Sequence, residues 1–195
     1  MTTDNLKFEI GFWHPFGDHA DEKAEDIIKR KQQEIKKTGW TLWSFQHRTK
    51  ETLERWLNEI KEKGPCNVLV FCSNGKGSNT KGTPRHCNYY LPIGETNPKA
   101  IPITIKVPHP MKKGTAGSAF IVKNIKYAPA HEEIQVEWFY SGQSRWQKDR
   151  SSTRGEHLIR RDSSGKPLRE FRAVLELQSP YLAEVGETEI EDRDQ

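Results

Sequence analysis

Two segments of this chain carry apolar residues at helical spacing, and they constrain the fold more than any other feature. Apolar residues form a stripe in residues 18–37, and Leu53, Trp56, Leu57 and Ile60 form a second stripe in residues 50–63. Asp18 and Thr49 are suitable N-cap residues. Gly39 and the pair Gly64-Pro65 then end the two helices. We therefore expect two amphipathic helices that pack against another layer.

Strand patterns separate and follow these helices. Residues 68–72 form a short apolar run typical of a buried strand, and the other segments alternate or are rich in β-branched and aromatic residues. The expected strands are 6–13, 40–46, 68–72, 101–107, 118–127, 134–139 and 168–178. The sequence predicts an α+β fold with a small, mostly antiparallel β-barrel or strongly curved sheet flanked by the two early helices. We expect one domain over residues 1–183 and a disordered acidic tail over residues 184–195.

The charge distribution favours a polyanionic partner. The net charge is +4, although the segment Glu184–Gln195 contains six acids and only one arginine, so the rest of the chain is strongly basic. The segment Gln143–Arg172 contains nine Lys and Arg residues against four acids, with Trp146 among them. When Lys and Arg side chains bind phosphates, the counterions of the nucleic acid are released, which favours binding. The basic surface therefore points to DNA or RNA as the partner.

The sequence also indicates where the chain acts. It has no signal-peptide pattern, and no apolar run approaches the roughly 18 residues of a membrane span. Cys66, Cys72 and Cys87 are an odd number of cysteines without a Cys-x-x-Cys pair, which favours free thiols in a reducing compartment. We expect a cytoplasmic protein that does not contact membranes.

Aromatic residues and a polar loop form the best functional clue. Trp13 ends the first expected strand, while Trp40 and Trp43 lie on opposite faces of the next, so only one of that pair can serve a given pocket. The loop after residue 72 begins Ser73-Asn74 and continues with Gly and Lys residues. Tryptophan faces can stack on a nucleobase, and Ser or Asn can hydrogen bond to its edge.

Catalytic patterns are weaker. The loop does not match a phosphate-binding P-loop, because Lys81-Gly82-Thr83 has the wrong order. The Glu-x-Lys spacings at Glu34 and Glu59 fall in the expected helices, where salt-bridged faces produce them by chance. A metal-dependent nuclease or nucleotide hydrolase that uses His14, His19 or His86 remains an alternative, as does a protein-interaction domain. We assign no catalytic residue, metal or cofactor.

The order of elements resembles the PUA-like superfamily, which includes the EVE, YTH and ASCH domains. Residues 6–13, 39–45 and 68–77 carry this resemblance, and the segment Phe71–Gly77 is similar to the turn of YTH-type readers. The segment Ser118–Val122 is the candidate for a later barrel strand. The resemblance implies a fold that reads nucleic acid, often a modified base flipped into an aromatic cage.

Our hypothesis from the sequence is a noncatalytic reader of DNA or RNA, which leaves the base, the modification and the oligomeric state open. The expected base-binding residues are Trp13, Trp43, Trp40, Ser73 and Asn74. The expected phosphate-binding residues are Lys76, Lys81, Arg85, Lys112, Lys113, Arg145, Lys148 and Arg150.

Overall fold

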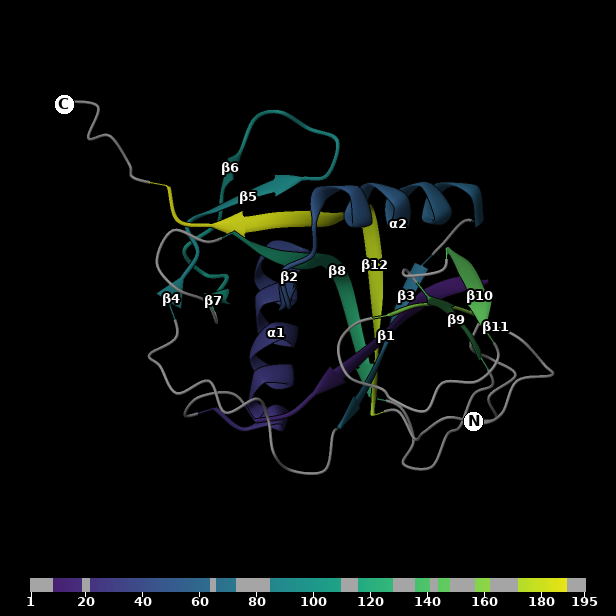
Figure 1. Cartoon of the computed structure of the whole chain (residues 1–195). Coiled ribbons are helices and arrows are strands. Elements are labelled where there is room, and N and C mark those ends of the chain that lie inside the picture. Colours follow the sequence, from purple (N-terminus) through teal and green to yellow (C-terminus); the bar gives the residue numbers. More distant parts are fainter. Residues whose placement is uncertain are drawn as a thin grey trace.

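A computed structural model shows an α+β protein in which two helices pack on a large mixed sheet (Figure 1). The structure describes residues 9–18, 22–63, 66–72, 85–109, 116–127, 136–140, 144–147, 157–161 and 172–188. Its helices are α1 (Ala24–Thr38) and α2 (Lys50–Lys63). Its strands are β1 (Ile10–Phe16), β2 (Thr41–Phe45), β3 (Cys66–Cys72), β4 (Arg85–His86), β5 (Tyr89–Pro92), β6 (Lys99–Ala100), β7 (Pro108–His109), β8 (Gly117–Tyr127), β9 (Val136–Tyr140), β10 (Arg145–Gln147), β11 (His157–Arg161) and β12 (Ala173–Gly186).

Both expected helices form, although α1 begins at Ala24 and not directly after Asp18. Gly39 ends α1 in the left-handed conformation at φ 87°, and its N–H binds the carbonyl oxygen of Ile35. Thr49 Oγ1 accepts a hydrogen bond from the Thr52 N–H in the first turn of α2. Asp18 is not the N-cap residue that we expected, because α1 starts at Ala24 and Lys23 occupies the N-cap position. Asp18 Oδ1 instead accepts a hydrogen bond from the Ala24 N–H at 2.9 Å.

β12 is the central strand of the sheet. Its first half pairs with β3 on one side and β8 on the other, and its second half lies between β8 and β5. From β3 the sheet continues through β1, β11 and β9 to β10, and from β8 it continues to β2. Every pairing in this sheet is antiparallel except that of β1 with β3.

The described strands do not close into a barrel, so the expected closed form is corrected to a large open sheet. The strand expected over residues 101–107 is also absent. A turn occupies Ile103 and Thr104, and the Ile105 N–H binds the Pro102 carbonyl oxygen at 2.8 Å. Ile101, Ile105 and Val107 are buried and Ile103 is fully exposed, so the alternating pattern reflects burial without strand pairing. β12 also extends to Gly186, three residues into the range expected as a tail.

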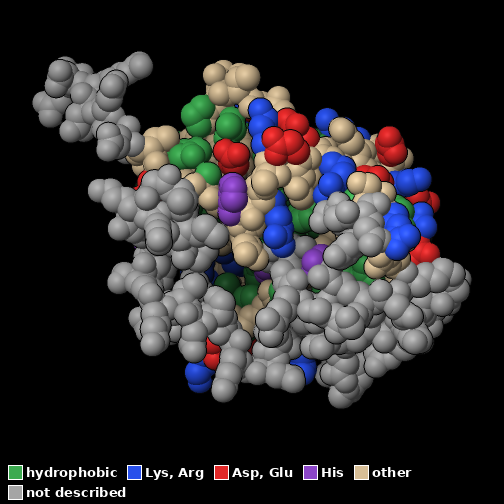
Figure 2. Space-filling model, viewed as in Figure 1, with side chains coloured by type: hydrophobic (Ala, Val, Ile, Leu, Met, Phe, Trp, Pro, Cys, Tyr) green, Lys and Arg blue, Asp and Glu red, His purple; other side chains and the backbone are tan. Residues whose placement is uncertain are grey.

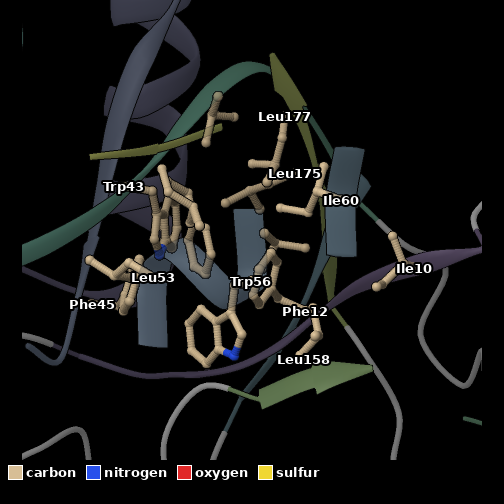
Figure 3. Close-up of a cluster of buried hydrophobic side chains, with 14 of the residues drawn as sticks. Ile10, Phe12, Trp43, Phe45, Leu53, Trp56, Ile60, Leu158, Leu175 and Leu177 are labelled. Atoms are coloured by element: carbon tan, nitrogen blue, oxygen red, sulfur yellow. The ribbon is translucent and has the colours of Figure 1, made fainter. Parts of the chain in front are cut away.

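The main hydrophobic core lies between the sheet and the two helices (Figure 3). Phe120 is central to it, because its ring stacks on Phe45 with a centroid distance of 4.2 Å and contacts Phe12 at 5.0 Å. Trp56 of α2 packs on the same Phe12 ring at 4.9 Å. A second cluster includes Leu42, Ile121 and Val185 with the apolar residues of the 101–107 segment. Both faces of β2 and β8 are therefore covered.

A buried polar network fastens α1 to the rest of the fold. Lys31 Nζ donates to Glu34 Oε2 at 2.8 Å, to Thr41 Oγ1 at 3.2 Å and to the Lys106 carbonyl oxygen at 2.7 Å. Glu34 also accepts hydrogen bonds from the Thr41 hydroxyl, from the Lys106 N–H and from Arg30. Lys31 and Glu34 are each only 3% exposed. Three separate segments, α1, β2 and the loop at Lys106, therefore meet at one ion pair.

Candidate nucleic-acid interface

The parallel pairing of β1 and β3 brings together two segments that the sequence analysis singled out. Trp13 is the register partner of Leu69, and Phe16 is the partner of Cys72. Because both strands run in the same direction, they end at the same edge of the sheet. Ser73 and Asn74 follow Cys72 directly in the chain, although their own positions lie outside the described residues. The polar loop therefore starts beside the end of the aromatic strand.

Trp13 lies in an aromatic cluster with two residues from β9 and β11. Its side chain is 0% exposed and meets Trp138 edge to face, with ring centroids 5.9 Å apart. His157, which is the register partner of Trp13 on β11, also meets Trp138 edge to face at 5.5 Å. Aromatic pairs favour this edge-to-face arrangement because the positive ring edge meets the negative ring face. Two tryptophans and a histidine thus lie together at the middle of β1, which ends three residues beyond Trp13 at Phe16 and not at Trp13 as expected.

Trp43 occupies the main core instead. It is 4% exposed, and its ring packs on Phe16 with a centroid distance of 5.1 Å. Its Nε1–H donates a hydrogen bond to His14 Nε2 at 2.9 Å, which requires that nitrogen to carry no proton. His14 is therefore engaged in the core as a hydrogen-bond acceptor.

Trp13 and Trp43 lie on opposite faces of β1. Successive side chains of a strand point to opposite faces, so His14 and Phe16 share one face with Trp43, and Trp13 points to the other. Trp40 belongs to neither group, because it packs on Tyr90 at 5.2 Å beside the second hydrophobic cluster. The two-ring pocket that pairs Trp13 with Trp40 or Trp43 does not form in this structure.

The structure describes only part of the expected phosphate-binding set. Arg145 is exposed as the first residue of β10. Arg85 lies in β4, where it pairs with His109 of β7. Lys and Arg side chains mix with Asp and Glu side chains on the described part of the face in Figure 2. The other expected site residues lie outside the described part of the chain: Ser73, Asn74, Lys76, Lys81, Lys112, Lys113, Lys148 and Arg150.

Sequence reasoning missed Trp138 and His157 as site residues. The segment 134–139 was expected as a strand, so the alternation of Val136 and Trp138 on one face was available as a signal. No local pattern links His157 to Trp13, because their pairing joins strands far apart in the chain. Only the tertiary structure brings these residues together.

Two potentially catalytic side chains among the described residues, Cys87 and His14, are buried. No three His, Cys, Asp or Glu side chains gather there as metal ligands would. Cys87 is buried, and burial together with the charge of Glu187 raises the pKa of its thiol to about 12. Its thiolate is therefore scarce near neutral pH, which makes it a poor nucleophile. His14 is held in the core by Trp43.

Comparisons with protein families, curated proteins and solved structures find no match for this chain. Among the described residues, no helix is both long enough and apolar enough to cross a membrane.

Proposed function

We propose that this chain is a noncatalytic nucleic-acid-binding protein that reads a base at the adjoining ends of β1 and β3. The parallel register of Phe16 with Cys72 carries this proposal, because it starts the Ser73-Asn74 loop beside the aromatic strand. Ligands of sheet proteins often bind just beyond the ends of adjacent parallel strands, where loops diverge. The basic character of the chain outside its acidic C-terminal segment agrees with a polyanionic partner.

Trp13 is the stacking residue in this proposal, and Trp138 and His157 support it. Ser73 and Asn74 would hydrogen bond to the edge of the base, and the basic residues that follow would hold phosphates. Trp13 has no exposed surface, so a base must displace the residues that pack on its ring. Binding should therefore change the environment of this tryptophan. Trp43 would require the main core to open and is not part of the proposed site.

We also propose a relationship to the PUA-like superfamily. The order of strand, helix, strand, helix and strand over β1 to β3 supports it, as does the Trp-bearing β2. In the proposed function a base, which can be a modified one, enters from a single strand or is flipped from a duplex. A modified base would be selected by the fit of its added group against Trp13 and Trp138.

The first expected result is salt-dependent binding. Titration of labelled DNA and RNA, single- and double-stranded, with and without base methylation, should give an affinity that falls as salt rises from 50 to 200 mM, as phosphate contacts require. The double variant Lys148→Ala/Arg150→Ala should lower the slope of log affinity against log salt by about 1.5, because each phosphate contact contributes about 0.7 to 0.9.

A matched control removes two charges from a helix. Lys36→Ala/Lys37→Ala changes two exposed lysines in the last turn of α1 and should leave the slope at the wild-type value. Absence of binding to every nucleic acid tested would refute the proposed function. An equal fall in slope for both double variants would show that only net charge matters.

The second expected result separates the two tryptophans. Trp13→Phe should weaken binding about tenfold without changing the salt slope, because base–aromatic stacking contributes about 1–3 kcal/mol and releases no counterion. Trp43→Phe should retain wild-type affinity, since its ring lies on the other face of β1. Fluorescence titration measures both, with circular dichroism to verify folding. Equal weakening by both substitutions would remove Trp13 from the site.

A further inference from the structure

Arg55 takes an unexpected position on α2. Glu51 and Glu59 lie one helical turn before and after Arg55 in the sequence, where they could form ion pairs with it. Among the described residues no ion pair joins Arg55 to either carboxylate. Its guanidinium lies instead over the ring of Phe139 on β9, with Cζ 4.9 Å from the ring centroid. The side chain is thus directed to the sheet and away from its helical neighbours.

Two nitrogens of the Arg55 guanidinium lack acceptors among the described residues. Its Nε and Nη2 atoms are shielded from solvent, and neither has a hydrogen-bond partner within the described structure. Shielded polar groups are nearly always hydrogen bonded, and a charged group without an acceptor is more costly than a neutral one. The cation–π contact with Phe139 compensates only part of that cost. Two donor nitrogens, Nε and Nη2, are therefore left for an acceptor that the described part of the chain does not supply.

A second arginine, Arg160, lies over the ring of Trp146, next to Phe139, and differs from Arg55 in having a carboxylate partner. Phe139 meets Trp146 of β10 edge to face at 5.2 Å, and Arg160 Cζ lies 4.9 Å from the centroid of Trp146. Glu137 Oε2 contacts both Nε and Nη2 of the Arg160 guanidinium and compensates its charge. Arg160 therefore has a carboxylate partner beside Trp146, whereas Arg55 has none among the described residues.

We propose that Arg55 binds a phosphodiester of single-stranded nucleic acid and that the adjacent base stacks on Arg160 and Trp146. Guanidinium N–H groups match phosphate oxygens, and arginine planes and indole rings both stack on bases. This subsite rests on the proposed function and extends it to a strand longer than the base that is read. Planar stacking surfaces favour a nucleic acid over an acidic peptide.

The position of the subsite favours a single strand over a duplex as the ligand. Trp138 and Phe139 are consecutive in β9, so their side chains point to opposite faces of the sheet. The base site at Trp13 and the phosphate site at Arg55 therefore lie on opposite faces. β10 is the last strand on this side among the described strands, so a flexible strand can pass around its edge while a stiff duplex cannot.

The test replaces Arg55 by methionine, which has a similar shape and no charge. Arg55→Met should bind a single-stranded oligonucleotide about tenfold more weakly than the wild type, yet unfold at an equal or higher urea concentration. A substitution that weakens ligand binding without lowering the stability of the fold is expected where the replaced side chain contributes to binding and not to folding. Pyrophosphate should raise the melting temperature of the wild type and not that of the variant. Lys61→Met, an exposed charge on the same helix, is the matched control and should behave as the wild type.

The outcomes separate this inference from the proposed function. Wild-type affinity in Arg55→Met, with oligonucleotide binding intact, overturns the subsite and leaves the function standing. Equal protection of both proteins by pyrophosphate also overturns it, as does equal weakening by Lys61→Met. A wild type that binds no oligonucleotide refutes the function and the subsite together. A poly-glutamate peptide that competes as well as the oligonucleotide would overturn the choice of nucleic acid.

Discussion

Replacing Glu34 by alanine should lower the free energy of unfolding by about 3–5 kcal/mol, because removal of one partner of a buried ion pair leaves the other charge uncompensated. Lys31, which is 3% exposed, would lose the carboxylate that contacts its ammonium at 2.8 Å. The Lys106 N–H and the Thr41 hydroxyl would lose their acceptor as well. α1 would thereby lose its polar attachment to β2 and to the loop at Lys106.

Urea unfolding followed by circular dichroism measures this effect. Glu25→Ala, an exposed acid in the first turn of α1, is the matched control and should change the free energy by less than about 1 kcal/mol. The double variant Lys31→Met/Glu34→Leu should recover much of the loss, since apolar residues of similar size often replace a buried pair without cost. A loss below about 1 kcal/mol in Glu34→Ala would show that the network contributes no net stability.

Lys31 should also make the protein more stable as the pH rises from about 8 to about 10.5. Burial disfavours the charged ammonium and lowers the pKa of Lys31 from 10.5 to about 8, although the ion pair with Glu34 acts in the opposite direction. Between these two values the unfolded chain binds one proton more at this site than the folded chain, so stability increases with pH. The full difference amounts to about 3 kcal/mol at 1.36 kcal/mol per unit.

Other groups titrate in the same range, so the measurement needs a difference between variants. The pKa of the Cys87 thiol is raised from 9.0 to about 12, which makes the folded protein hold a proton that the unfolded chain has lost and lowers stability above pH 9. Unfolding should therefore be followed from pH 7 to pH 10.5 in Cys87→Ala and in Cys87→Ala/Lys31→Met. The rise should appear in the first protein and be absent from the second. Parallel curves would contradict a lowered pKa for Lys31.

The apolar patterns were sufficient for the helices and most strands. The predicted range of α2 matches the observed one, because Leu53, Trp56, Leu57 and Ile60 all face the main core. Trp56 was expected in the core and lies there. The strand predicted over residues 101–107 was wrong, because alternating apolar residues indicate alternating burial, and burial does not require strand pairing. Its apolar residues pack on the second hydrophobic cluster, and a turn at Ile103 prevents strand pairing.

The candidate site was only partly predictable. The alternation rule correctly separated Trp40 from Trp43, but it could not relate either of them to Trp13 on another strand. The contact of Trp13 with Trp138 depends on β11, which lies between β1 and β9 and pairs with both. Glu34 was assigned to a salt-bridged helix face, yet Glu34 and Lys31 are both buried, because α1 is covered by the loop at Lys106 as well as by the sheet. The sequence of α1 alone cannot show that a loop 75 residues away packs over it.

The sequence by itself determined the α+β class, the presence of both helices, the range of α2 and the basic character of the chain outside its C-terminal segment, because periodicity and charge are properties of neighbouring residues. Only the tertiary structure decided that β1 pairs in parallel with β3, that Trp13 and Trp43 face opposite sides, and that Arg55 turns toward Phe139. These features arise from pairing between distant strands. Their free energy depends on the register and burial of the whole sheet, which no short segment contains.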